Sequence, residues 1–263
     1  MRAYVQLAKL RLLTELTYRF DVYAGILTNL ILMVATVFLW KTAFRGMGTV
    51  GGVDEGQMIT YAILASLLGA LFSPGVDDAL NDKIRNGSIA VDFIRPIHPP
   101  LSWLADDIGS TISSFLMRVI PLLIFSSLFI RVPLPANLPA ALLFIPCCIL
   151  SFGILWMLSA VCGLIAFWTM ELGELGIAKD AVVRVLSGGL VPIWFFPGWA
   201  QKISAWLPFQ YAVQLPLEIY IGRAGPREAL AGIFIQFVWF VILGLLAAWL
   251  WSRGRRRVLV QGG

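Results

Sequence analysis

Residues 141–170 read ALLFIPCCILSFGILWMLSAVCGLIAFWTM, and this stretch decides the fold class. It contains no charged side chain, and it is longer than the roughly 20 apolar residues that a helix needs to cross a hydrocarbon core about 30 Å thick. Lipid offers no hydrogen-bond partner to the backbone, so a helix is the simplest way to satisfy it there. The stretch therefore predicts a transmembrane helix.

The rest of the chain has the same character. Of its 263 residues, 59% are hydrophobic and 13% are charged, which is too apolar for a water-soluble domain of this size. About six crossings would use about half of the chain and leave only short loops. We therefore expect an all-α polytopic membrane protein with six transmembrane helices, without an appended globular domain or an internal repeat.

Polar and proline-rich turns separate the apolar stretches. The predicted spans cover residues 22–44, 58–74, 101–130, 141–170, about 181–196 and 230–251. Residues 1–20 mix apolar and basic positions at helical spacing, which indicates an amphipathic elbow helix in the membrane interface. They lack the apolar core and cleavage site of a signal peptide, so we expect them to be retained and residues 21–263 to form the transmembrane domain.

Helix breakers interrupt the fifth stretch and the segment after it. We expect the outer half of the fifth span to be broken, and residues 197–222 to form short re-entrant helices, because they are too punctuated for a span and too apolar for a free loop. The breakers and the aromatic residue that mark this outer region are Gly188, Gly189, Pro192, Pro197, Trp206 and Pro208.

The most polar internal segment, residues 76–100, follows the second span. Its charged residues lie at helical spacing, and Gly87 is a typical helix stop. These charged residues are Asp77, Asp78, Asp82, Lys83 and Arg85. The pattern predicts a short amphipathic helix in water.

The distribution of basic residues predicts the orientation. With a cytoplasmic N-terminus, the inner segments hold thirteen of the 20 Lys and Arg residues and the outer segments hold six. We therefore expect both termini and residues 76–100 to be cytoplasmic. The net charge of +5 is then explained by anionic lipid headgroups at this face, without a nucleic-acid partner.

Several kinds of chemistry are excluded by missing motifs. No phosphate-binding loop of the form G-x-x-x-x-G-K-[ST] is present, so the chain alone should not hydrolyse ATP. The only histidine is His98, and no zinc-protease motif occurs. Cys147, Cys148 and Cys162 lie in apolar stretches and are interpreted as small hydrophobic residues. We expect no catalytic residue, metal or cofactor in this chain.

Two classes of membrane protein that would need no partner ATPase remain open. A membrane-embedded lipid-diphosphate enzyme could hold magnesium with Asp77, Asp78 and Asp82. However, Lys83 and Arg85 follow at once, which favours a solvated helix. An ion-coupled secondary transporter usually carries an internal repeat and an intramembrane acid, and neither is visible.

Three more charged residues are candidates for function. Arg118 lies near the middle of the third predicted span, where an unpaired charge is costly, so we expect a partner from another helix or subunit, or a structural polar contact. Glu171 and Glu174 are three residues apart at the boundary after the fourth span. They are interpreted as solvated boundary charges or as contacts to a cytoplasmic partner.

Taken together, four features make the chain resemble the type-2 family of ATP-binding-cassette (ABC) exporter permeases. They are the elbow helix before Val22, DKIRNGSIAVDFIRPIHP at 82–99, PIWFFPGWAQKISAWLPFQYAV at 192–213, and the basic tail SRGRRRV at 252–258. The likeness spans nearly the whole chain.

This resemblance implies a function for the polar segment. Asp77 to Gly87 would be a coupling helix that docks into a groove of a separate ABC ATPase. Its polar grip would be formed by Asp82, Lys83, Arg85 and Asn86, and Arg95 would fix the return to the membrane.

The resemblance also implies a complex. Two ATPase subunits would bind ATP and Mg²⁺, and a second permease, identical or different, would complete the translocation path along spans two and five. Residues 197–222 would close its outer mouth. The complex would lie in a bacterial plasma membrane and act as an exporter.

Overall fold

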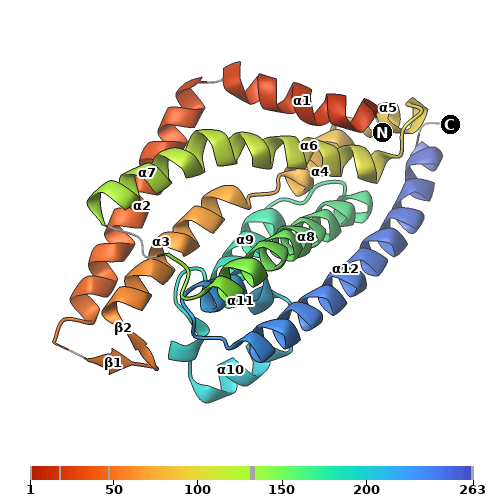
Figure 1. Ribbon diagram of the computed structural model, residues 1–263. Coiled ribbons are helices and arrows are strands. Elements are labelled where there is room, and N and C mark those ends of the chain that lie inside the picture. The colour runs from red at the N-terminus through yellow and green to blue at the C-terminus, as the bar shows by residue number, and fades with distance from the viewer. Residues whose placement is uncertain (1, 18, 47, 131–133, 262–263) are drawn as a thin grey trace.

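The computed structural model describes residues 2–17, 19–46, 48–130 and 134–261, which form a bundle of helices (Figure 1). The first helices are α1 (Arg2–Thr17), α2 (Arg19–Ala43), α3 (Glu55–Leu71), α4 (Val76–Arg85), α5 (Ile89–Ile94), α6 (Pro99–Ser114) and α7 (Ile120–Phe129). A π-helical turn, η1 (Phe115–Val119), joins the last two. Next come α8 (Leu138–Thr169), α9 (Leu175–Leu186), the 3-10 turn η2 (Ile193–Phe195), α10 (Gly198–Ala205), α11 (Phe209–Tyr220) and α12 (Pro226–Gln261). A small antiparallel hairpin, β1 (Thr49–Val50) and β2 (Val53–Asp54), interrupts this helical order.

Five helical runs in the described part of the chain are long and apolar enough to cross a membrane. They are Val22–Ala43, Glu55–Arg85, Pro99–Phe129, Leu138–Thr169 and Pro226–Arg257. Each overlaps one of the six predicted spans. The predicted class, a polytopic helical membrane protein, is confirmed at this level.

The fifth predicted span has a different form. Residues 181–196 do not make one long helix, because α9 has 12 residues and ends at Leu186. Gly188 then adopts a φ of 78°, a conformation that strains residues with a side chain. The Gly188 carbonyl accepts a hydrogen bond from the Tyr61 hydroxyl at 2.8 Å. The chain thus breaks at the predicted glycines, and a sixth long apolar helix is not found among the described residues.

A second break, at residues 72–75, divides α3 from α4. The carboxylate of Asp107 holds this break. Asp107 Oδ1 accepts a hydrogen bond from the Gly75 backbone N–H at 3.2 Å, and Oδ2 accepts one from Trp156 Nε1 at 2.8 Å. Because Asp107 belongs to α6 and Trp156 to α8, the direction in which α4 leaves α3 is set by two other helices.

The helices α8 and α12 lie side by side along much of their length (Figure 1). Glycines permit this close packing: a Cβ on Gly153 would lie 2.7 Å from Phe240, and one on Gly254 would lie 2.6 Å from Phe167. Trp251 of α12 is buried in an apolar cluster with Trp156 of α8. Both chain ends and α5 meet at one end of this bundle, whereas α10 and the β-hairpin lie at the other (Figure 1).

The N-terminal helix α1 packs along α6 (Figure 1). The contact is close, since a Cβ on Gly109 would collide with the Ala8 carbonyl oxygen. The Tyr4 hydroxyl accepts a hydrogen bond from the His98 backbone N–H at 3.1 Å. A helix is thus found where an elbow helix was predicted, and its place in the membrane interface stays a prediction.

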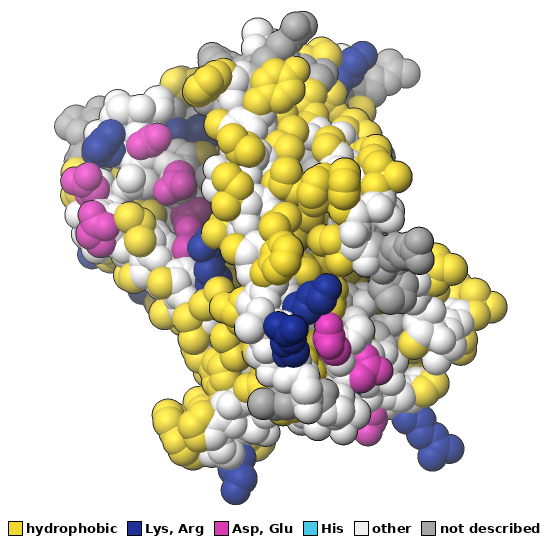
Figure 2. Space-filling view, turned by 90° about the vertical axis from the view of Figure 1, so that its left-hand side faces the viewer, with side chains coloured by type: hydrophobic (Ala, Val, Ile, Leu, Met, Phe, Trp, Pro, Cys, Tyr) yellow, Lys and Arg dark blue, Asp and Glu magenta, His cyan; other side chains and the backbone are white. Residues whose placement is uncertain are grey.

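Large apolar side chains cover much of the outside. Phe20 is 83% exposed, and Leu128 and Phe129 are each 72% exposed. Figure 2 shows a broad band of hydrophobic side chains on one face, with charged side chains gathered at its edges. Exposed apolar surface of this extent is typical of contact with lipid or with a partner protein.

Candidate coupling surface

The short helix α4 is amphipathic in the structure. Val76, Asp77 and Leu80 are 2%, 3% and 1% exposed, so they form its buried face. Asp78, Asp82 and Arg85 are exposed and lie four and three residues apart along the helix. This spacing places them on one side of the helix, opposite the buried face. The predicted short amphipathic helix is therefore present.

Asp77 is the centre of a buried ion pair. The Lys179 ammonium of α9 lies 2.6 Å from Asp77 Oδ2 and 2.8 Å from the Ser159 hydroxyl of α8. It also lies 2.9 Å from Asp180 Oδ1. Burial alone would lower the pKa of Lys179, but the hydrogen bonds and charges of the two carboxylates outweigh it and raise that pKa. Lys179 therefore stays charged at neutral pH and ties α4 to α8 and α9.

Close backbone approach supports this junction. A Cβ on Gly163 of α8 would lie 2.8 Å from the Asp77 Cα, so no larger residue fits there without moving α4. The Asn81 side-chain oxygen accepts a hydrogen bond from the Leu172 backbone N–H at 2.8 Å. The buried face of α4 is thus fixed along its length to the end of α8.

The exposed end of α4 carries a weaker contact. Arg85 Nη1 lies 3.5 Å from Glu171 Oε1, and Arg85 Nη2 lies 3.8 Å from Asp82 Oδ1. All three side chains are more than half exposed, so these pairs contribute little to stability. Glu174 is exposed and precedes α9 without forming a side-chain cap. The Glu171 carboxylate thus lies beside the polar side of α4.

The turn between α4 and α5 follows the predicted stop. Gly87 has a φ of 73°, and the Asn86 side chain accepts a hydrogen bond from the Ser88 backbone N–H at 2.9 Å. Asn86, Gly87 and Ser88 are exposed. The loop that reverses the chain is therefore open to a partner.

The helix α5 is anchored by Asp92. Its carboxylate accepts hydrogen bonds from Lys83 Nζ at 2.7 Å and from Trp103 Nε1 at 2.9 Å, and Arg95 Nη1 lies 3.9 Å from its other oxygen. Asp92 is 5% exposed. Lys83 therefore bonds within the α4–α5 hairpin.

These positions divide the predicted coupling residues into two groups. Asp77, predicted as part of the coupling helix, is buried and paired with Lys179, so it does not belong to an exposed docking face, and Lys83 of the predicted polar grip is directed to Asp92. The exposed members, which we call the α4 docking face, are Asp78, Asp82, Arg85, Asn86, Gly87 and Arg95.

Sequence reasoning did not single out Lys179, Asp92 or Asp107. The Asp77–Lys179 contact joins residues 102 positions apart, and the Asp107–Trp156 contact joins residues 49 apart. No local pattern signals such a pair. In the sequence Lys179 lies beside Asp180 in a short polar loop segment, so nothing local separates it from the solvated charges around it.

Arg118 lies in the π-helical turn η1, a helix irregularity that is often found at functional sites. Its guanidinium packs against Gly25, because a Cβ on Gly25 would lie 3.4 Å from Arg118 Nε. Gly25 is in the first turn of the Val22–Ala43 span. Arg118 therefore lies near the end of that neighbouring span, and no ion pair with another described side chain is found for it.

The predicted outer residues lie around η2, α10 and α11. Pro192 and Pro208 are buried, whereas Pro197 and Trp206 are exposed. Gln214 of α11 holds the broken segment, since its side-chain oxygen accepts the Ile193 N–H at 2.7 Å. The segment after α9 thus forms short helices, of which α11 packs against α3 and α8 while α10 packs against α11 and η2.

Arg223 joins this region to the β-hairpin. Its guanidinium carbon lies 4.4 Å from the centre of the Trp194 ring, and Arg223 Nη1 donates a hydrogen bond to the Gly51 carbonyl. Glu218 Oε1 lies 3.7 Å from Arg223 Nε. Three segments distant in sequence therefore meet at the end of the bundle that lies opposite the termini.

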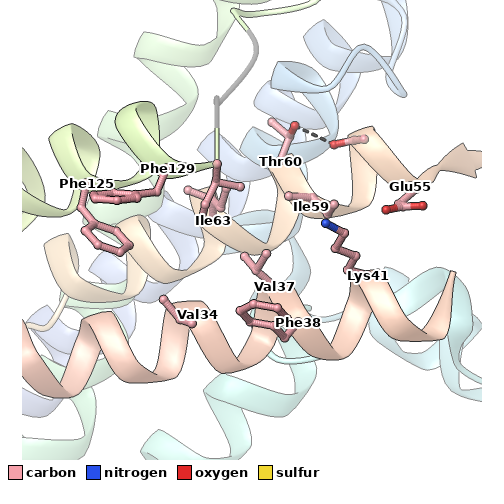
Figure 3. A pocket seen from close by; sticks show the side chains of 12 residues that line it. Val34, Val37, Phe38, Lys41, Glu55, Ile59, Thr60, Ile63, Phe125 and Phe129 are labelled. Carbon is pink, nitrogen blue, oxygen red and sulfur yellow. Dashed lines mark hydrogen bonds between the residues drawn. The ribbon is translucent and has the colours of Figure 1, made fainter. Parts of the chain in front are cut away.

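An apolar groove of about 400 Å³ runs between α2, α3 and α7 (Figure 3). Phe38, Ile63 and Phe125 line it, with Lys41 and Glu55 at one end. The groove thus belongs to the first, second and third spans. The predicted path along spans two and five, which needs a second permease, stays a prediction.

The three acidic residues of the alternative magnesium site, Asp77, Asp78 and Asp82, do not face one another in the structure. Asp77 is committed to Lys179 while Asp78 and Asp82 face outward, and no group of three metal-ligating side chains occurs in the described residues.

The apolar helical runs, together with the amphipathic α4–α5 segment at one end of the bundle, define the chain as a polytopic helical membrane protein. The chain belongs to a family of ABC transporter permeases: the family model described as "ABC-2 family transporter protein" matches residues 30–262. This confirms the resemblance seen in the sequence, and membership of this family indicates that the chain is a transport subunit. No curated protein and no solved structure matches the chain.

Proposed function

We propose that this chain is the membrane-spanning subunit of an ATP-driven exporter, and that the α4 docking face couples it to a separate ATPase. The observation that carries the proposal is the division of α4 into two faces. One face is buried and tied to α8 and α9 through Asp77 and Asn81, while the other presents Asp78, Asp82 and Arg85. A partner that binds the exposed face and displaces α4 would therefore also displace α8 and α9.

The proposed mechanism uses these contacts as a lever. Two ATPase subunits bind ATP and Mg²⁺ and draw together, and the α4–α5 hairpin moves with the subunit that holds it. The buried pair Asp77–Lys179 transmits this displacement to α9, which leads into the break at Gly188. Tightly packed helices shift between discrete arrangements rather than bending continuously, so a small displacement changes the packing of the bundle.

The proposed complex contains two permeases, identical or different, in a bacterial plasma membrane with both termini in the cytoplasm. The cytoplasmic position of both termini is supported by the excess of Lys and Arg in the segments at the end of the bundle that carries α4, α5 and the termini. The segment containing α10 and α11 then faces outward and closes the outer mouth. The chain itself holds no cofactor in this proposal.

The test is reversal of one exposed charge. The permease is co-expressed with the ATPase subunit encoded nearest to it, and the amount of ATPase that co-purifies is measured. We expect Arg85→Glu to reduce co-purification by at least about tenfold, because it places a like charge beside Asp82 and Glu171 and removes a guanidinium from the docking face.

The matched control is Arg227→Glu, which makes the same charge change at an exposed residue near the start of α12. It should leave co-purification unchanged. If the two variants retain equal amounts of ATPase while both remain monodisperse, the α4 docking face is not the coupling site.

A further inference from the structure

A basic hollow lies where α8 and α12 end, close to the chain termini. It has a volume of about 390 Å³ and is lined by Trp168, Trp249, Leu250, Arg253, Arg256 and Arg257. The hollow lies outside the α4 docking face, and neither the proposed coupling nor the family assignment explains it.

Helix packing fixes the position of these side chains. Gly254 allows α12 to approach Phe167 of α8 closely, since a Cβ there would lie 2.6 Å from that ring. On the buried side of α12, the Trp251 ring stacks on Phe93 with the ring centres 5.5 Å apart. The rotation of α12 about its axis is therefore set, and Arg253 and Arg257 are held beside the groove between the two helices.

The two tryptophans organise the cations. Arg253 lies over the Trp249 ring at 5.7 Å, and Arg257 lies over the Trp168 ring at 5.7 Å. A guanidinium over an aromatic face is attracted by the ring electrons and keeps its N–H groups free at the edge. The donors of both arginines are thus available to a ligand.

The positive charge of the hollow is not balanced within the described part of the chain. Arg253, Arg256 and Arg257 are exposed, and no ion pair with a described carboxylate is found for any of them. Guanidinium groups gathered at one hollow repel one another unless an anion joins them. Planar guanidinium forks match the oxygens of a phosphate group, which can bridge several of them.

The surface next to the hollow indicates which kind of anion would bind there. Leu245, Leu246 and Trp249 of α12 are 67%, 40% and 54% exposed, and they continue the exposed side of the helix away from the arginines. The ligand therefore needs an anionic head and an apolar body. Tryptophans beside a basic cluster at the end of apolar helices are typical of the boundary between headgroups and acyl chains.

We propose that this hollow is a binding site for an anionic phospholipid of the cytoplasmic leaflet. The phosphate lies among Arg253, Arg256 and Arg257, and one acyl chain follows the exposed apolar side of α12. The bound lipid holds the ends of α8 and α12 together at the end of the bundle that carries the α4 docking face. The proposal does not depend on ATPase coupling, so the two are tested separately.

The test is lipid binding by the purified full-length chain. Native mass spectrometry in detergent compares added phosphatidylglycerol with phosphatidylcholine of the same acyl chains. The site variant is Arg253→Gln, Arg256→Gln and Arg257→Gln combined. A basic side chain near an anionic lipid surface contributes about fivefold to binding, so we expect the site variant to bind phosphatidylglycerol on the order of 100-fold more weakly, with phosphatidylcholine binding unchanged.

Two controls make the result specific. The charge-matched variant Arg45→Gln, Lys202→Gln and Arg227→Gln removes three exposed cations elsewhere, and it should keep phosphatidylglycerol binding within about twofold. Replacing the three site arginines by lysine should give binding between that of the site variant and that of the unmodified chain, because the charges remain while the guanidinium forks and their stacking on the tryptophans are lost.

Salt supplies an independent measurement on the unmodified chain, which does not depend on how well the variants fold. Phosphatidylglycerol binding should weaken as salt rises from about 0.01 M to 0.5 M, since exposed charges are screened over this range. Soluble glycerol phosphate should not displace the lipid at equal concentration. Equal lipid binding by the site variant, loss in the charge-matched variant, no effect of salt, or displacement by glycerol phosphate would each overturn the proposal.

Discussion

The ammonium of Lys179 is held by oxygen atoms from α4, α8 and α9 itself, so one side chain joins three helices. Asp77 and Lys179 have side chains only 4% and 14% exposed, and both charges have therefore left most of their water. A buried pair of this kind is weak evidence for stability, because desolvation offsets much of the attraction. Its value here lies in specifying how α4 sits against α8 and α9.

Removal of one partner should be costly. We expect Lys179→Met to lower the free energy of unfolding by roughly 3 kcal/mol, because Asp77 is left buried without its counter-charge. Asp77→Asn should cost less, since Lys179 keeps Asp180 and Ser159 as partners. Thermal unfolding of the purified chain in detergent measures both.

The double variant Asp77→Asn with Lys179→Met is the decisive comparison. Because it removes both charges, it should be more stable than Lys179→Met alone. If the two single effects simply add, the pair does not act as a unit.

Among the elements, α9 is the one whose form differs most from a simple span. It stops at Leu186 because Ser187 and Gly188 turn the chain. The Gly188 carbonyl accepts a hydrogen bond from the Tyr61 hydroxyl, and the Ser187 carbonyl accepts one from the Gln214 backbone N–H. Two of the carbonyls freed by the break, those of Ser187 and Gly188, are thus hydrogen-bonded to protein, as irregular backbone inside a membrane protein requires. Because the break is held in place in this way, α9 has a defined end and can move as a rigid helix.

The break should not tolerate a side chain. We expect Gly188→Ala to destabilise the chain by roughly 1–3 kcal/mol, from its positive φ and from a Cβ that would lie 2.5 Å from Gln214 Oε1. Gly198→Ala is the matched control, because a Cβ there meets nothing within 4 Å. Its unfolding temperature should stay close to that of the unmodified chain, and an equal loss in both variants would contradict the role of the break.

The molecule as a whole has two chemically different ends. One carries both termini, α4, α5 and the arginines of α12, and the other carries the β-hairpin and α10 (Figure 1). The apolar band between them is the part that matches a bilayer (Figure 2). This polarity is the basis for placing the α4 docking face in the cytoplasm.

Cysteine labelling tests that orientation. In a background with Cys147, Cys148 and Cys162 replaced by alanine, a membrane-impermeant maleimide on intact cells should label Lys202→Cys but not Asp82→Cys. After the cells are permeabilised, both should be labelled, since both positions are exposed. The reverse pattern on intact cells would invert the topology.

The local patterns of the chain were enough for the fold class, for the spans found as long helices and for the break after α9. They also located α4 and its stop at Gly87, because amphipathic spacing and a left-handed glycine are properties of neighbouring residues. These features depend on each segment separately, and the family match agrees with the resemblance they gave.

The amino-acid sequence alone does not indicate which charged residues of α4 are exposed to a partner and which hold the bundle together. Asp77 and Asp78 are adjacent and identical in type, yet Asp77 is buried against Lys179 and Asp78 is exposed. The same is true of the arginines of α12, which become a binding site only beside Trp168 of α8. These roles depend on contacts between helices far apart in sequence, and only the packing of the whole bundle decides them.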